Sequence, residues 1–318
     1  MSRAFLLLPA LLIGAHSFHI LKKDKSKNHQ EITYTAILRA TKNICMKADA
    51  KFQEPKTLDP KALAKACRKE AFGSNFELGI KMITYHNVMT DLQHASDEEF
   101  HFDSERFKDG KQLITSGLKN IEDSIMKNKF DDARERLGQI MHTLQDFYSH
   151  SNWIELGYTK PCTALINPDD KLPNLADKAT KTCEESSGKT SNGAKLLKSI
   201  IEKKILTSGY FGGSKPSGKC SHGGTLDFTT GFGKGADGIN KDYDGSSHGK
   251  DHNKASEVAI AATVELLDKI WKSVNQADRF FSLVGLQKDT PSGEMKTYIP
   301  FIDFKSRYKD ANQVNINI

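Results

Sequence analysis

The chain has 318 residues, of which 37% are hydrophobic, and its 46 basic and 40 acidic residues give a formal net charge of +6. This length is enough for one large domain or two and for a sizeable buried core. The mild positive charge favours anionic partners such as phospholipid surfaces or nucleic acid. No Lys/Arg block is dense enough to form a nucleic-acid patch, so we expect a solvated charged surface.

The amino-terminal residues predict a targeting segment. Arg3 precedes an apolar run from Ala4 to Ala15, which small and polar residues follow. This is the layout of a secretory signal peptide, and the run is too short to span a bilayer. We therefore expect residues 1–17 to be removed and the mature chain to begin near Phe18. No other stretch approaches a transmembrane length, so we expect a soluble, secreted protein.

Apolar residues at helical spacing predict a mainly α-helical chain, and no hairpin of alternating strands is apparent. Pro60 stands just inside the start of the second predicted helix, where proline is tolerated. The last long helix is nearly all apolar, so we expect it to be central and buried. In chain order the predicted helices cover residues 30–52, 57–72, 75–94, 106–128, 131–153, 192–206 and 253–274.

Residues 208–249 depart from this pattern, because twelve glycines fall among them. A stretch of this length is either a flexible linker or a functional loop. Because Cys220 can anchor it and a long helix follows, we expect a loop folded over the site, within a helical domain of residues 18–287. Residues 288–318 carry no clear pattern and are interpreted as a C-terminal extension.

Five cysteines in a secreted chain predict disulfides with one cysteine left over. Cys45 and Cys67 flank two helical segments joined by a short turn, and we expect them to pair. The connectivity among Cys162, Cys183 and Cys220 cannot be deduced; we favour Cys183–Cys220, with Cys162 free or intermolecular. No Cys-x-x-Cys is present, which argues against a thiolate zinc site.

The most informative motif lies at the end of the predicted helix 131–153. His142, Asp146 and His150 are spaced four residues apart, so they share one helical stripe. Apolar residues occupy the opposite stripe, so one face can pack while the other gathers two imidazoles and a carboxylate, as in metal sites inside helical bundles. The alternative is a polar face that holds two histidines by chance. The apolar stripe comprises Ala133, Leu137, Ile140, Leu144 and Phe147.

A family resemblance rests on the same motif. Residues 142–157 read His-Thr-Leu-Gln-Asp-Phe-Tyr-Ser-His-Ser-Asn-Trp-Ile-Glu-Leu-Gly. This segment resembles the signature of the Het-C domain family, which occurs in fungal heterokaryon-incompatibility proteins and in the amino-terminal region of von Willebrand factor A domain-containing protein 7. Other segments, among them residues 218–224 and 238–242, agree with the animal branch and extend the resemblance from about His29 to Leu286.

The Het-C domain is in turn distantly similar to zinc-dependent phospholipase C and the P1-type nucleases. This similarity implies an all-α, multi-helix bundle of the phospholipase C/P1 nuclease type, with zinc as cofactor in one to three ions. It implies candidate catalytic roles for Asp146, as a bridging carboxylate, and for Asp103. The implied metal ligands are His142, Asp146, His150, His29, His101, His248 and His252.

Two departures from that group weaken a full three-metal centre. Ser256 stands where the group has a glutamate, and no tryptophan lies near Phe18 to act as the amino-terminal ligand. The sequence is therefore compatible with a centre of one or two metal ions and also with a fold that binds no metal.

Two functions compete at this point. The first is a secreted zinc-dependent phosphoesterase, similar to phospholipase C, that acts on a phospholipid or another phosphodiester. The second is a non-catalytic secreted module for recognition or interaction, whose protein partner the sequence does not indicate. A nuclease is disfavoured, because no basic strip with interleaved aromatic residues is present to bind single strands.

Overall fold

The computed structural model describes residues 18, 26–184, 193–212, 214–224, 226–229 and 237–287. The predicted signal peptide and C-terminal extension lie outside the described residues. Within these residues the chain folds into helices, and its β-structure is limited to isolated bridges. The prediction of an all-α, multi-helix fold is confirmed.

The described α-helices are α2 (His29–Ala48), α3 (Pro60–Ala66), α4 (Gly73–Gln93), α5 (Glu98–His101), α6 (Phe107–Met126), α7 (Phe130–His150), α8 (Lys198–Glu202), α9 (His252–Val274) and α10 (Ala277–Val284). Short 3-10 helices cover Glu70–Phe72, Asp103–Glu105, Thr163–Leu165 and Gly249–Asp251.

Two predicted helices differ clearly from the observed ones. Residues 192–206 form only the short helix α8, because the backbone N–H groups of Ala194 and Leu197 donate to the distant carbonyls of Gly238 and Thr182. The predicted helix 131–153 ends at residue 150 as α7, and the N–H of Asn152 already donates to the distant carbonyl of Thr207.

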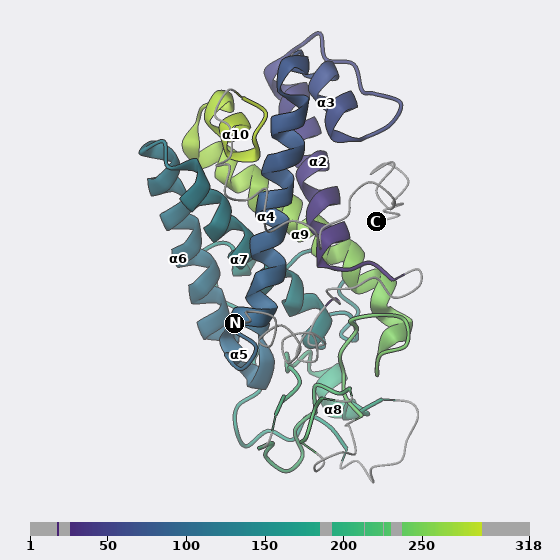
Figure 1. Cartoon of the computed structure of the whole chain (residues 1–318). Coiled ribbons are helices and arrows are strands. Elements are labelled where there is room, and N and C mark those ends of the chain that lie inside the picture. Colours follow the sequence, from purple (N-terminus) through teal and green to yellow (C-terminus); the bar gives the residue numbers. More distant parts are fainter. Residues whose placement is uncertain are drawn as a thin grey trace, which may run out of the picture.

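Helix α7 is the centre of the bundle. It packs against α4, α6 and α9, and α2 lies along α9 (Figure 1). These neighbours bury both of its stripes: His142, Asp146 and His150 are 0% exposed, as is Leu144. The polar stripe of the motif is therefore an interior surface, where charged groups need partners.

The helices α4 and α7 approach each other closely at Gly138. A Cβ atom built on this glycine would lie 2.4 Å from the carbonyl oxygen of Ile83 and 2.8 Å from the backbone nitrogen of Asn87. Only a residue without a side chain permits this approach. The contact lies one turn before Asp91 in α4 and His142 in α7, so it sets the spacing of these two side chains.

The start of α2 is fixed by a capping box. The side chain of Asn28 accepts a hydrogen bond from the N–H of Glu31 (2.9 Å), and the Glu31 carboxylate accepts one from the N–H of Asn28 (3.3 Å). As a result His29 is the first residue of the helix, and its buried ring faces α7.

Both favoured disulfides form. Cys45 pairs with Cys67, and Cys183 pairs with Cys220. Cys162 is free and buried, so an intermolecular disulfide at this residue is not supported.

The described part of the Gly-rich segment 208–249 packs against the carboxyl end of α7. The N–H of Gly209 donates to the carbonyl of His150, and the N–H of Lys241 donates to that of Ser149. The segment is thus positioned over the end of the motif helix, below the bundle in Figure 1.

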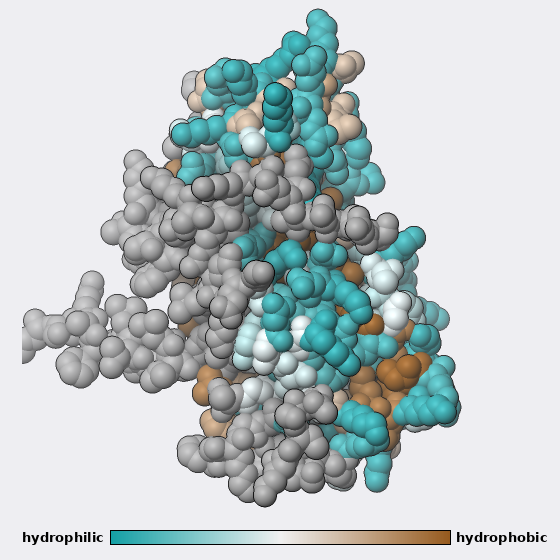
Figure 2. Space-filling model, turned by 90° about the vertical axis from the view of Figure 1, so that its right-hand side faces the viewer, coloured by the Kyte–Doolittle hydropathy of each residue, from teal (hydrophilic) through white to brown (hydrophobic). Residues whose placement is uncertain are grey.

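Charged and polar residues are spread over the surface. The described part of the face in Figure 2 is mostly hydrophilic, with smaller hydrophobic areas in its lower half. None of the helices in the described part of the chain is both long and apolar enough to cross a membrane.

Candidate metal centre

Four side chains from three helices form a first group of potential metal ligands: Asp91 of α4, His101 of α5, and His142 and Asp146 of α7. Their exposed fractions are 0–2%. The Nε2 atom of His142 lies 3.5 Å from Asp91 Oδ1, 3.3 Å from His101 Nδ1 and 3.0 Å from Asp146 Oδ2. His101 Nδ1 lies 2.9 Å from the same Asp146 oxygen.

These separations match the requirements of a small divalent ion. Zinc binds histidine nitrogen and carboxylate oxygen at about 2.0–2.2 Å, which corresponds to donor–donor distances of roughly 3.3–3.6 Å in a tetrahedron. The measured values of 2.9–3.5 Å in the first group are close to that edge.

His29 lies directly beside the first group. Its Nε2 atom is 3.1 Å from Asp146 Oδ1, and its ring stacks on His142 with 4.3 Å between the ring centroids. Asp146 therefore contacts His29 through one carboxylate oxygen and both histidines of the first group through the other.

Hydrogen bonds to carbonyl oxygens set the orientation of these rings. His101 Nε2 lies 3.0 Å from the carbonyl oxygen of His94, and His29 Nδ1 lies 2.7 Å from Oε1 of Gln145. A carbonyl oxygen only accepts, so both of these nitrogens carry protons and the other nitrogen of each ring faces Asp146. Metal-binding histidines are commonly oriented in this way.

The charges of the site hold Asp146 and His142 in the forms that bind metals, whereas His101 is held in its protonated form, and a metal ion must displace that proton. Burial opposes the ionisation of Asp146, but the positive charges of the surrounding histidines outweigh it and hold the pKa of this carboxyl well below its usual range. Burial also lowers the pKa of His142, which favours its neutral form. For His101, the hydrogen bond to Asp146 and the charge of that carboxylate outweigh burial and raise the pKa to about 9.

Some buried polar atoms of the first group make no hydrogen bond. These are Asp146 Oδ1 and His142 Nδ1. A buried polar atom without a partner is costly, and a bound ion or ordered water is the usual explanation. These two atoms are not the ones through which the first group converges, since Asp146 Oδ1 faces His29 and the group meets at His142 Nε2 and Asp146 Oδ2. The donor types and their separations by themselves fit a zinc ion.

A second group lies at the carboxyl end of α7 and consists of Asp103, His150 and His222. One ligand atom from each of these residues lies within 4.8 Å of the others, and all three side chains are buried. Asp242 adjoins this group, with its Oδ1 atom 3.3 Å from His150 Nε2.

The chain between the two groups is locally strained. Phe102, Ser104 and Glu105 have left-handed backbone conformations, with φ of 56°, 51° and 60°. Such conformations are uncommon for residues other than glycine. Here they turn the chain so that His101 joins the first group and Asp103, two residues later, joins the second.

The structure divides the residues predicted as ligands into three sets. His101, His142 and Asp146 come together in the first group, with His29 beside it. His150 and Asp103 belong to the second group, so the helical stripe of α7 serves both groups.

His248 and His252 belong to neither group. His248 contacts Glu155 (2.6 Å) and the carbonyl of Ala194 (2.8 Å), and His252 contacts the carbonyl of Lys241 (2.7 Å) and the N–H of Lys27 (3.0 Å). Both ring nitrogens of each residue are thus engaged within the protein.

Glu155 also accepts a hydrogen bond from the buried ammonium group of Lys241 (2.9 Å). Burial opposes the ionisation of Glu155, but the charge of Lys241 and the contact with His248 outweigh it and lower the pKa of Glu155 from 4.5 to about 2. This network ties the Gly-rich segment to the residues that follow α7.

Three members of the site were missed by the sequence reasoning: Asp91, His222 and Asp242. His222 and Asp242 lie in the segments 218–224 and 238–242, whose family resemblance was a usable signal. Asp91 carries no such signal, because only the packing of α4 on α7 brings it to His142.

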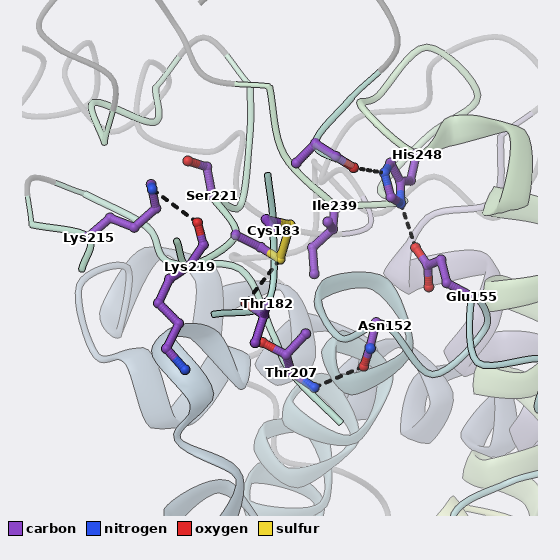
Figure 3. The surroundings of a disulfide bond; sticks show 12 residues. Asn152, Glu155, Thr182, Cys183, Thr207, Lys215, Lys219, Ser221, Ile239 and His248 are labelled. Atoms are coloured by element: carbon purple, nitrogen blue, oxygen red, sulfur yellow. Dashed lines mark hydrogen bonds and ion pairs between the residues drawn. A yellow bond between two sulfur atoms is a disulfide. The ribbon is translucent and has the colours of Figure 1, made fainter. Parts of the chain in front are cut away.

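The disulfide Cys183–Cys220 lies beside Lys219 and Ser221 (Figure 3), in the segment that continues to His222. Cys220 lies two residues before His222, and the backbone of Tyr210 bonds to both residues. Lys219 donates to the buried carboxylate of Glu105 at 2.7 Å. The position of His222 is therefore fixed by the disulfide, by the backbone hydrogen bonds to Tyr210 and by the ion pair of Lys219 with Glu105.

A family profile and individual relatives both relate this chain to the same family. The profile described as the VWA7 N-terminal domain matches residues 58–281. The chain is 32% identical over 276 residues to mouse von Willebrand factor A domain-containing protein 7, covering 82% of this chain and 30% of that protein. It is 31% identical over 295 residues to the human protein, covering 86% and 32%.

The chain thus spans about a third of the length of the curated relatives it matches, at 30–32%. No solved structure matches the chain. The predicted resemblance to the amino-terminal region of von Willebrand factor A domain-containing protein 7 is confirmed, whereas the Het-C and phospholipase C similarities stay predictions.

Proposed function

This chain belongs to the VWA7 N-terminal domain family, and we propose that it is a secreted, zinc-dependent hydrolase of phosphoesters. The observation that carries the proposal is the first group, in which four buried side chains each place a nitrogen or oxygen donor within 4.8 Å of the others. Nitrogen and carboxylate donors without cysteine are typical of catalytic zinc sites.

In this proposal the zinc ligands are Asp91, His101, His142 and Asp146. A zinc ion bound there supplies Lewis acidity, which activates water and stabilises negative charge on a phosphoryl group. The carboxylate of Asp146 stays ionised and holds His29 beside the first group. Gln145 in turn orients His29 through the hydrogen bond to its Nδ1 atom.

The proposed substrates are phospholipids or other phosphodiesters. The net charge of +6 favours an anionic partner. The Het-C resemblance and its distant similarity to phospholipase C support the same class. We propose secretion through a signal peptide at residues 1–17 and a single helical domain at 18–287, followed by the extension 288–318; the two disulfides suit an oxidising compartment.

A second candidate is a non-catalytic recognition module that carries structural zinc. It is favoured by the closed character of the first group, whose members are at most 2% exposed. Four protein ligands complete a tetrahedron, whereas a catalytic zinc keeps one position for water.

Metal content and hydrolysis separate these two candidates. The full-length secreted chain is purified without chelator, analysed for zinc, and assayed with bis(p-nitrophenyl) phosphate and with phosphatidylcholine vesicles. His142→Ala is expected to lose the zinc of the first group and the hydrolysis. His86→Ala, which alters a half-buried histidine of α4 outside both groups, is the matched control and is expected to keep both.

Each result has a definite meaning. Zinc without hydrolysis supports the non-catalytic module. Zinc and hydrolysis that both survive in His142→Ala contradict the role of the first group. A well-folded wild-type chain that binds no zinc refutes both candidates.

A further inference from the structure

We propose that a groove between α6 and residues 168–175 binds an acidic segment of a partner protein. This inference goes beyond the proposed function and does not depend on it, because the groove contains none of the candidate zinc ligands. The groove has a volume of about 450 Å³. Its lining combines basic and apolar side chains, among them Lys108, Lys111, Lys171, Pro168, Leu172 and Leu175.

Two parts of the chain form the walls of this groove. The helix α6 contributes Lys108 and Lys111, and the loop after the 3-10 helix Thr163–Leu165 contributes Lys171. The loop also contributes the apolar residues, including Leu172, which are half-buried or exposed. Lysines therefore line both walls, with apolar surface beside them.

The positive charge of the groove is not neutralised within the described part of the chain. None of its three lysines forms an ion pair with another described residue, and its lining includes no acidic residue. Asp109, next to Lys108 in the sequence, pairs with Arg106 at 3.2 Å, and Asp170 accepts a hydrogen bond from Asn167 at 3.0 Å. The groove thus has an excess of positive charge that an anionic partner complements.

Lys111 is a preorganised part of the groove. Its ammonium group donates to the carbonyl oxygens of Pro168, at 3.1 Å, and of Asp170. An ammonium group has three N–H donors, so one donor stays available to a ligand, and the neutral carbonyls leave the charge in place. Because these hydrogen bonds already hold the side chain, binding at Lys111 loses less side-chain entropy than binding at an unrestrained lysine.

The geometry favours a peptide over other anionic partners. The ammonium group of Lys111 bonds to the opposite wall, so it is not presented on an outward face, as contact with a flat bilayer requires. No aromatic side chain lines the groove, so nucleic-acid bases find no surface for stacking. An extended acidic segment can reach lysines on both walls and place an apolar side chain against Leu172 and Leu175.

The test is a binding assay with a short fluorescein-labelled peptide in which glutamate and leucine alternate. A control peptide carries glutamine in place of glutamate. Fluorescence anisotropy with the full-length chain measures binding at low and high salt, with and without chelator. We expect the acidic peptide to bind, more weakly at high salt because exposed charges are screened, and the control peptide not to bind. Chelator should change neither result.

Substitutions locate the binding within the groove. Lys108→Gln and Lys171→Gln each remove one charge and no side-chain hydrogen bond to a described residue. Each should weaken peptide binding about two- to fivefold, the effect of a single exposed ion pair. Lys119→Gln is the matched control, because it removes the same charge from an exposed position of α6 outside the groove, and its affinity should equal that of the wild type.

Three results overturn the inference. Affinity that is unchanged in both Lys108→Gln and Lys171→Gln, or lowered equally in Lys119→Gln, assigns binding to the overall charge. Binding of phosphatidylserine vesicles without binding of the acidic peptide excludes the peptide as the occupant. A folded wild-type chain that binds neither excludes the groove as a binding site. Because none of these measurements requires zinc, they are independent of the test of the proposed function.

Discussion

Substitution of Gly138 by alanine tests whether the close approach of α4 and α7 builds the metal centre. The new Cβ atom would lie 2.4 Å from the carbonyl oxygen of Ile83 and 2.7 Å from the Cβ of His86. Ordinary contacts of this kind are about 3.4 Å or longer, so the helices must separate by about 1 Å. Because the nearest neighbour is backbone, a change of rotamer cannot relieve the clash.

The expected loss of stability follows from two opposing effects. Overpacking of a core costs about 1–3 kcal/mol, whereas replacing glycine by alanine within a helix gains about 1 kcal/mol. A clash with backbone belongs at the upper end of that range, so we expect a net loss of about 2 kcal/mol. For a chain of this size, that loss lowers the Tm by about 3–4 °C.

The same substitution should weaken zinc binding. Asp91 and His142 lie one turn beyond the contact, and their ligand atoms are 3.5 Å apart. Separation of the helices lengthens this distance, and a drop in zinc affinity of about tenfold or more is expected, as for other changes around metal ligands.

Urea unfolding followed by circular dichroism, with zinc titration of the folded protein, measures both effects. Gly73→Ala is the matched control, because a Cβ atom there meets its nearest neighbours at 3.6 Å, and its stability should stay the same or rise by up to about 1 kcal/mol. If Gly138→Ala is as stable as Gly73→Ala and binds zinc as tightly as the wild type, the reasoning is refuted.

Two further predictions concern the network around the Gly-rich segment. The folded pKa of Glu155, about 2, lies below its ordinary value of 4.5, so its contribution is present above pH 4.5 and is lost as the pH falls through 2. The loss should be about 3 kcal/mol, and Glu155→Gln should abolish that part of the acid dependence in unfolding titrations; an unchanged profile contradicts the network. Serine at both Cys183 and Cys220 should cost about 4 kcal/mol, and serine at both Cys45 and Cys67 should cost about 3 kcal/mol. Urea unfolding of the two double variants measures both losses, and a wild-type free energy of unfolding in either one contradicts the prediction.

Local sequence determined the parts of this protein that depend on neighbours along the chain. The apolar periodicity located α4, α6, α7 and α9 within a few residues, because a helix buries one stripe at a fixed repeat. The motif placed His142, Asp146 and His150 on one stripe for the same reason, and the two helical segments between Cys45 and Cys67 indicated that disulfide. The pair Cys183–Cys220 was favoured but could not be deduced from the sequence.

Only the tertiary structure decided how that stripe is used. Asp91 reaches His142 because α4 packs on α7 at Gly138, and His222 reaches His150 because the Gly-rich segment is fastened at Cys220. The same folding directs His248 and His252 toward Glu155 and the carbonyl of Lys241, away from both groups. Helical periodicity depends on residues within a few positions, whereas these contacts depend on helix crossings and loop paths between residues far apart in the chain.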